Sequence, residues 1–260
     1  MSSAFRRAFV PLVAELAATC GHARELRVCA DPDNLPMSHA DGSGFENRIA
    51  ALIAEELRAE LRYEWMPQRR GFVRKTMGAG LCDLFIGVPK AFERVLTTRP
   101  YYRSAYVFVA GAKARGIERF DDERLRGLRV GVQLPGDDLA ATPPGHALAA
   151  QGHVDNVRGT TPYGDPTAQQ RLISAVAAGE LDLAVIWGPQ AGDLARRAGL
   201  EVRRVKPPAE LAPMPFEFAI AMGVRKGDRA LRDELDAAIE KRRADIDAIL
   251  AAYSVPRVDR

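Results

Sequence analysis

The sequence predicts an α/β fold made of two lobes that are joined by a hinge of two crossing strands. Short apolar runs rich in β-branched residues alternate along the chain with segments whose apolar residues recur at helical spacing, and this alternation occurs in two separate series. A chain of 260 residues that is 47% hydrophobic and 27% charged can bury a sizeable core. These values also exclude a disordered or a fibrous protein.

The first series predicts a parallel sheet. Residues 25–30 (ELRVCA) are a β-rich run that ends in turn residues, and residues 45–61 carry apolar side chains at helical spacing. A strand stopped by a proline follows at residues 62–66, then a helix at 71–79 and an apolar strand at 83–88. Because strands separated by helices pair in parallel through right-handed crossovers, we expect these three strands to share one sheet.

The second series repeats the same pattern and predicts the second lobe. It comprises strands at residues 128–133, 154–158 and 183–187 and helices at 145–151, 168–178 and 193–198.

Three further segments stand outside both series. Residues 106–110 (YVFVA) and 216–224 (FEFAIAMGV) are extended, and a long helical region ends the chain at 228–253. The two extended segments can carry the chain from one lobe to the other and back. We therefore expect lobe one to comprise residues 24–109 and 214–260, and lobe two residues 110–213.

A cleft between the lobes is the expected binding site. In open α/β sheets ligands bind beyond the carboxyl ends of the strands, and clefts between domains are favoured positions. The segments that should face this cleft are residues 31–36, 67–70, 87–94, 133–138 and 187–190.

Charge and motifs exclude several classes of function. The net charge is only +3, from 37 Lys and Arg against 34 Asp and Glu, which is not typical of a nucleic-acid-binding protein. No run of 18 apolar residues predicts a membrane span. The four histidines lack metal-ligand spacing, and no nucleophile motif or phosphate-binding loop is present. We therefore expect neither a metal site nor an enzyme.

The first 23 residues have the order of a secretory signal peptide. Arg6 and Arg7 precede an apolar stretch at residues 8–18, and small residues at Gly21 and Ala23 follow. Glu15 interrupts the stretch, so an amphipathic N-terminal helix, or a true start site further upstream, is the alternative.

The cysteines are consistent with export. Cleavage after Ala23 would remove Cys20 and leave Cys29 and Cys82, an even pair that predicts a disulfide in an oxidising compartment. Two buried, reduced thiols are the alternative, and sequence spacing alone does not decide between them.

Several segments together resemble one family. These are LRVCADPDNLP, GFENRIA, PQRRGFVR, GLCDLFIGVP, LTTRPYYRSAYVFV, VGVQLPGDDLAATPPGHALA and FAIAMGVRKGD, spread over roughly residues 25–257. They are similar to the branch of periplasmic solute-binding proteins that is associated with quinoprotein (methanol) dehydrogenases, the MxaJ/XoxJ type.

The resemblance implies a type II, solute-binding family 3-like fold in the periplasm. It implies partnership with a methanol dehydrogenase that depends on pyrroloquinoline quinone (PQQ) and on calcium or a lanthanide, and the enzyme's cytochrome c is a further candidate partner. The implied role is accessory and non-catalytic, in maturing or activating that enzyme. We expect this chain to be a monomer and to bind no cofactor itself.

The resemblance also singles out residues of the cleft. Amino-acid-binding relatives have an Asp at the position of Asp31 and an Arg that clamps a carboxylate at the position of Arg94. Turn capping by Asp31 and an ordinary surface role of Arg94 are the alternatives. Trp187 stands near where those relatives hold the ligand's ammonium with an Asp, which argues against a standard amino-acid ligand and suits an apolar surface or a protein partner. A Trp buried between strand and helix is the alternative. Asn34 and Gln133 lie in cleft-facing segments and complete this set.

Basic and aromatic residues suggest contacts with a protein partner. Arg69 and Arg70 precede a predicted helix, where the positive charge of Arg opposes the helix dipole, so helix stability does not explain them. We expect them to contact an acidic patch on a partner, and simple solvation of the two charges is the alternative. Arg99 and Tyr101 belong to an Arg–aromatic cluster typical of interfaces, with packing in the hinge as the alternative. The expected function is therefore accessory binding of the dehydrogenase. The rival is a receptor that delivers a small polar solute to an ABC transporter.

Overall fold

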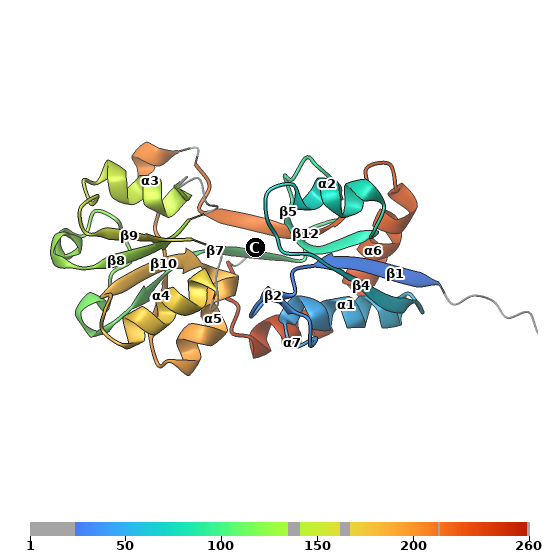
Figure 1. Ribbon diagram of the computed structural model, residues 1–260, viewed down its shortest axis with the longest axis horizontal. Helices are drawn as coiled ribbons and strands as arrows, with labels where there is room; N and C mark the ends of the chain where they lie inside the picture. The colour runs from blue at the N-terminus through green and yellow to red at the C-terminus, as the bar shows by residue number, and fades with distance from the viewer. Residues whose placement is uncertain (1–23, 135–140, 162–166, 213, 259–260) are drawn as a thin grey trace, which may run out of the picture.

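The structure is a computed structural model that describes residues 24–134, 141–161, 167–212 and 214–258. The predicted signal peptide and most of the cleft-facing segment 133–138 lie outside these ranges. Figure 1 shows two lobes side by side, each with helices packed on a sheet, and two long strands that pass between them. The predicted α/β class and the hinge of two crossing strands are therefore confirmed.

Lobe one contains the first parallel sheet. Its strands lie in the order β4 (Glu60–Trp65), β1 (Glu25–Ala30) and β5 (Leu84–Pro89). Three helices share one buried apolar cluster with these strands: α1 (Phe45–Glu56), α6 (Arg229–Lys241) and α7 (Arg243–Ala252). A second cluster on this lobe includes residues of α2 (Phe72–Lys75) and the 3₁₀ turn Met77–Ala79. The ribbon of β2 (Asp33–Asn34) and β3 (Ser38–His39) lies between β1 and α1 in the chain.

Lobe two contains the second parallel sheet, in the order β9 (Val157–Thr160), β8 (Val130–Gln133) and β10 (Leu183–Trp187). On one face α4 (Ala168–Ala177) and α5 (Gly188–Arg197) share an apolar cluster with the sheet, and α3 (Pro143–Ala150) belongs to the cluster on the other face.

The hinge joins both sheets. Strand β7 (Tyr102–Ala110) pairs antiparallel with β12 (Glu217–Val224) through its first residues and with β10 and β11 (Glu201–Arg204) through its last. Strand β12 continues into lobe one, where it pairs with β5 and with β6 (Leu96–Thr97). Among the described residues these pairings connect ten strands into one sheet. The residue boundaries of the two lobes stay a prediction.

The C-terminal segment forms a third crossing that the sequence analysis missed. The Val258 N–H donates to the Arg103 carbonyl at 3.0 Å, and the Ser104 hydroxyl donates to the Pro256 carbonyl at 2.5 Å. A Cβ at Gly192 of α5 would overlap the carbonyl oxygen of Ser254, so only glycine fits this close contact. The chain thus returns from α7 in lobe one to the surface of α5 in lobe two.

Several predicted boundaries were wrong. The helix expected at residues 45–61 ends at Glu56, because Arg58 adopts a left-handed φ of 51° and the chain then enters β4. The helix expected at 71–79 is divided at Thr76 into α2 and a 3₁₀ turn. The long region at 228–253 is two helices that meet at Arg242.

The boundary of α5 has the largest consequence for the site. We expected this helix at residues 193–198, but it begins at Gly188, directly after β10. A proline is tolerated in the first helical turn, where its missing N–H is not needed, so Pro189 does not delay the helix. Trp187 is therefore the N-cap residue of α5 as well as the last residue of β10.

Candidate functional site

A polar cavity lies between the lobes and brings together four of the predicted site residues. Its volume is about 330 Å³. The predicted residues that line it are Asp31, Asn34, Arg69 and Gln133. We call it the cleft cavity, and its other lining residues are Pro32, Asp33, Pro67, Gln68, Thr167, Gln169 and Gln190.

Asp31 uses both carboxylate oxygens to hold the backbone. The Asp33 N–H donates to Oδ1 at 3.0 Å and the Gln68 N–H donates to Oδ2 at 2.7 Å. The first bond closes an Asx turn after β1, and the second ties the end of β1 to the segment after β4. The capping role of Asp31 is thus present in the structure.

Asn34 connects the two sides of the cleft cavity. Its Oδ1 accepts hydrogen bonds from Nε2 of Gln190 at 3.3 Å and from Nε2 of Gln169 at 3.5 Å. The Gln169 amide, which is almost fully buried, also donates to the Leu35 carbonyl at 2.9 Å. We call these three amides, Asn34, Gln169 and Gln190, the amide clasp. It occupies polar groups that could otherwise bind a solute.

A second cavity of about 270 Å³ lies beside the hinge and is mostly apolar. Trp187 lines it and makes edge-to-face contacts with Tyr106 and Phe218, each with ring centroids 5.5 Å apart. Half-buried Trp187 thus stands on the wall of a cavity and packs against rings of the hinge strands β7 and β12. We call this the aromatic cavity, and the rest of its lining consists of Met37, Gly87, Pro89, Tyr102 and Ile220.

Glu46, in the first turn of α1, lies against the wall of the aromatic cavity. A Cβ at Gly87, a lining residue, would overlap Oε1 of Glu46. This oxygen is closed to solvent and has no hydrogen-bond partner, and burial raises the pKa of Glu46 to about 7. The hydroxyl of Tyr102 is also buried without a partner, and burial, followed by the charge of Glu46, raises the pKa of Tyr102 well above its ordinary value.

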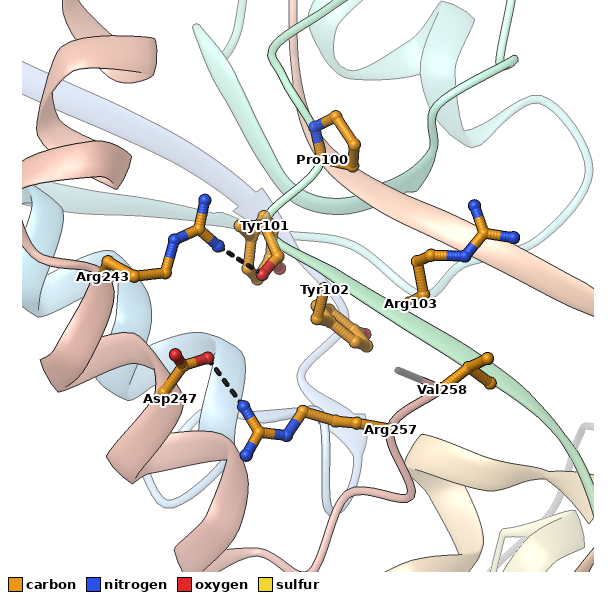
Figure 2. A pocket seen from close by; sticks show the side chains of 8 residues that line it. All are labelled: Pro100, Tyr101, Tyr102, Arg103, Arg243, Asp247, Arg257 and Val258. Atoms are coloured by element: carbon orange, nitrogen blue, oxygen red, sulfur yellow. Dashed lines mark hydrogen bonds and ion pairs between the residues drawn. The ribbon is translucent and has the colours of Figure 1, made fainter. Parts of the chain in front are cut away.

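Tyr101 lies at a different place, in a hollow beside the hinge. Figure 2 shows Arg243 reaching toward Tyr101 and Arg257 toward Asp247. Arg243 donates to the Tyr101 carbonyl at 2.7 Å, and the Tyr101 hydroxyl donates to the Ile86 carbonyl at 3.0 Å. With its ring buried in the lobe-one core, Tyr101 packs the hinge and is not available to a partner.

Three predicted arginines lie outside both the cleft cavity and the aromatic cavity. Arg70 and Arg94 are exposed and line neither cavity. Arg99 faces α6, where its backbone N–H donates to Asp236 at 2.6 Å and its guanidinium lies 4.0 Å from the same carboxylate. The structure therefore does not bring Arg94 to the residues that would share a carboxylate ligand with it.

Cys29 and Cys82 are joined by a disulfide, with their Cα atoms 5.6 Å apart. The bond links β1 to the segment before β5 and is buried in the apolar cluster that includes Met77 and Phe85. A buried bond of this kind is typical of proteins from oxidising compartments.

The described residues contain no group of three or more His, Cys, Asp and Glu side chains placed to hold a metal ion. Within the same ranges no helix is long and apolar enough to cross a membrane.

Sequence reasoning missed Glu46, Gln169 and the partners of Trp187. Glu46 resembles any acidic residue in the first turn of a helix, where it is favoured by the dipole. Gln169 follows the helix cap Thr167 and carries no motif. Tyr106 and Phe218 were assigned to hinge strands, but the pairing that brings both rings into contact with Trp187 is not visible in the sequence.

The chain is similar to known proteins over nearly its whole length. Residues 26–255 match the bacterial extracellular solute-binding proteins, family 3. The chain is 35% identical to Protein MoxJ of Methylorubrum extorquens AM1 over 248 residues, which cover 89% of this chain and 81% of that protein. Its identity to Protein MoxJ of Paracoccus denitrificans is 30% over 246 residues, covering 89% and 88% of the two chains.

Two solved structures are also similar over nearly the whole chain. The periplasmic binding protein XoxJ from Methylobacterium extorquens AM1 is 38% identical with a TM-score of 0.75, covering 90% of this chain and 100% of that one. MxaJ from Methlophaga aminisulfidivorans MPT is 26% identical with a TM-score of 0.77 and the same coverage. The chain belongs to the bacterial extracellular solute-binding proteins of family 3, and within them to the group that includes the MoxJ, MxaJ and XoxJ proteins.

Proposed function

We propose that this chain is a periplasmic, non-catalytic accessory protein of methanol oxidation that binds a PQQ-dependent methanol dehydrogenase. The similarity to MoxJ, MxaJ and XoxJ proteins supports the association with methanol oxidation. The buried disulfide and the extracellular solute-binding family support the periplasm. In this proposal the dehydrogenase carries the PQQ and its calcium or lanthanide ion, its cytochrome c is a second candidate partner, and the accessory chain acts as a monomer.

The observation that carries the proposal is the aromatic wall around Trp187. Trp187, Tyr106 and Phe218 come from β10, β7 and β12, which are the strands that meet at the hinge. Trp and Tyr anchor protein interfaces because they bury a large apolar area with few rotatable bonds. A cavity walled in this way suits an apolar segment of a protein partner better than a zwitterionic amino acid, because an unpaired ammonium or carboxylate would be costly to desolvate.

The amide clasp adds a second argument. Asn34 accepts hydrogen bonds from Gln169 and Gln190, so these polar groups of the cleft cavity already bond to one another between the lobes. Arg94 lies away from this cavity and does not supply a clamp for a carboxylate. The chain would favour the active dehydrogenase by binding its loaded form more tightly than its empty form, since only a difference in affinity shifts the equilibrium between them.

Binding of the cognate dehydrogenase tests the proposal. The chain is immobilised and the enzyme is applied by biolayer interferometry in two forms, with and without PQQ and metal. We expect saturable binding with different affinities for the two forms. Trp187→Ala should weaken it at least tenfold, about 1.4 kcal/mol. Absence of binding by both forms of the enzyme would refute the proposal.

Trp65→Ala is the matched control. Trp65 is also half-buried and stacks on Tyr63 with ring centroids 4.4 Å apart, but it lines neither the aromatic cavity nor the cleft cavity. Its replacement removes the same side chain elsewhere and should leave binding unchanged. Equal losses in both variants would point to a general effect on the fold.

The second candidate is a receptor for a small polar solute of an ABC transporter. The polar lining of the cleft cavity by Asn34, Gln133 and Arg69 favours it. This function requires a solute that replaces Gln169 and Gln190 as the hydrogen-bond partner of Asn34, so Asn34→Ala should weaken the binding of that solute. Thermal stabilisation by a defined polar solute, together with no affinity for the dehydrogenase, would favour the receptor.

A further inference from the structure

The hollow beside the hinge gathers three arginines from three different elements (Figure 2). Its volume is about 500 Å³. Arg103 comes from β7, Arg243 is the first residue of α7, and Arg257 belongs to the C-terminal segment. Among the described residues that line it Asp247 alone is acidic, so the lining has a net charge of +2. We call it the hinge hollow, and its other lining residues are Pro100, Tyr101, Tyr102 and Val258.

A ligand in the hinge hollow can reach all three guanidinium groups. The side chains of Arg103, Arg243 and Arg257 have exposed fractions of 43%, 23% and 41%. The hollow is therefore open to solvent at its charged groups, unlike the buried carboxylate of Glu46.

Contacts within the chain hold two of these arginines in place. Arg243 donates to the Tyr101 carbonyl at 2.7 Å, and Nη1 of Arg257 donates to Asp247 at 2.7 Å. Because a guanidinium carries several N–H donors, each of them keeps donors for a ligand.

Arg103 is less engaged than the other two. Its side chain makes no hydrogen bond with a described residue and lies 3.9 Å from a carboxylate oxygen of Glu217. That carboxylate accepts a hydrogen bond from Arg204 instead. The positive charge of Arg103 is thus only weakly compensated.

Stability does not explain this collection of positive charges. A cation in the first turn of a helix opposes the helix dipole, and Arg243 occupies that position in α7. The pair of Arg257 with Asp247 is exposed on both sides, and such pairs add little to stability. A negatively charged ligand would compensate both costs.

The arrangement of the arginines indicates the shape of this ligand. Figure 2 shows Arg103 and Arg243 on opposite sides of the two tyrosines, with Arg257 beside Asp247. Pro100 and Val258 add apolar surface to the lining. A compact anion can contact only one of these positions at a time, whereas two anionic groups joined by a short hydrocarbon chain can contact two.

We propose that the hinge hollow binds a dicarboxylate group, with Arg103, Arg243 and Arg257 as its counter-ions. Carboxylates match guanidinium groups because the two planar groups can form paired hydrogen bonds. Two carboxylates balance the charge of the lining, and the chain between them suits its apolar surface. Such a group can come from a free dicarboxylic acid or from two neighbouring acidic side chains of a protein. The inference does not depend on the dehydrogenase being the partner.

Isothermal titration calorimetry of the full chain at pH 7 and low ionic strength tests this site, with succinate as the probe. Butyrate has a chain of the same length with a single carboxylate, and inorganic phosphate is a compact anion. We expect saturable binding of succinate, at least tenfold tighter than that of either analogue. Added salt should weaken it, because the arginines are exposed. Failure of succinate to bind, or equal binding of butyrate or phosphate, overturns the proposal.

Two variants locate the site. Arg243→Gln and Arg257→Gln each remove one positive charge and should lower the affinity for succinate at least fivefold. Arg119→Gln is the matched control, because Arg119 also pairs with an exposed Asp but does not line the hinge hollow. An unchanged affinity in both site variants, or an equal loss in the control, contradicts the assignment. If Arg243→Gln does not fold, Arg257→Gln still tests it from a more exposed side chain.

A capped dipeptide of two glutamates, with an acetyl group and an amide at its ends, distinguishes the two sources of the ligand. Binding of succinate without binding of the dipeptide indicates a free dicarboxylic acid. Tighter binding of the dipeptide indicates a protein segment. Either result supports the dicarboxylate site, and binding of neither compound refutes it.

Discussion

At the scale of single residues, Glu46 makes stability depend on pH. Burial raises its folded-state pKa from 4.5 to about 7, so the folded chain holds a proton that the unfolded chain releases. The contribution of the protonated group to stability is full below pH 4.5 and is lost as the pH rises through 7. Glu46→Gln should therefore match the unmodified chain near pH 4 and exceed it by up to about 3 kcal/mol near pH 8. Urea unfolding at both pH values measures this, and a difference independent of pH would contradict it.

Gly87 and Glu46 should be energetically coupled. Gly87→Ala places a methyl group where Oε1 of Glu46 lies, and such overlap costs about 1 to 3 kcal/mol. In a Glu46→Ala background the obstacle is absent, so the same substitution should cost much less. A double-mutant cycle by urea unfolding gives the coupling energy. Additive effects would show that the two residues do not share this space.

Some single-residue roles could be predicted from the sequence and others could not. The turn around Asp31 was predictable, because an Asp before Pro-Asp-Asn is typical of a side chain that accepts from its own turn. The alternative for Arg94, an exposed surface role, agrees with its place in the structure. The destabilising burial of the Glu46 carboxylate was not predictable, because Gly87 and the tyrosines that surround it come from distant parts of the chain.

At the scale of elements, the disulfide ties β1 to the segment just before β5. Its half-cystines, Cys29 and Cys82, are 53 residues apart, so the bond closes a long loop in the unfolded chain. Reduction should lower the free energy of unfolding by about 2 to 4 kcal/mol. Thermal unfolding with and without reductant measures the loss, with Cys29→Ala/Cys82→Ala as a control that reductant should not affect. An unmodified chain insensitive to reductant would contradict this role.

Each lobe also fixes the start of its third strand with an Asp–Arg pair. Asp83 precedes β5 and is bound by Arg27, and Asp182 precedes β10 and is bound by Arg129. Hydrogen bonds from the Arg129 guanidinium lower the pKa of almost fully buried Asp182 to about 2. The pair therefore adds stability above pH 3.8, and this stability is lost as the pH falls toward 2.

Replacement of Arg129 tests this pair. Arg129→Leu leaves a buried carboxylate without its main partner, so it should lower the unfolding temperature at pH 7 and have little effect near pH 2. Arg119→Leu is the matched control, since Arg119 pairs with Asp121 on the exposed surface, where both side chains keep about half of their area. A control variant that loses as much stability as Arg129→Leu would contradict the argument.

Element boundaries were less predictable than element types. The apolar residues of 45–61 keep helical spacing beyond Glu56, where the helix ends. The last of them, Leu61, lies in β4 and packs against the same apolar cluster from the strand. Strand β11 was missed, since Glu201–Arg204 is a polar sequence that forms a strand only by pairing with β7. The early start of α5 placed Trp187 at a helix N-cap, which the sequence alone did not indicate.

At the scale of the whole molecule, the hinge separates two kinds of binding surface. The cleft cavity between the lobes is polar, and its amide clasp joins β2 to α4 and α5. The aromatic cavity lies where β7, β10 and β12 meet, and Glu46 stands behind its wall. A partner that occupies the aromatic cavity thus contacts the strands that connect the lobes.

We propose that this chain promotes the active state of a methanol dehydrogenase. The most direct measurement is the rate at which methanol oxidation appears when the cognate apo-enzyme receives PQQ and its metal ion, with increasing amounts of this chain. We expect a saturable increase that Trp187→Ala reduces and Trp65→Ala does not. An unchanged rate at concentrations of the chain that saturate the enzyme in the binding assay would contradict it.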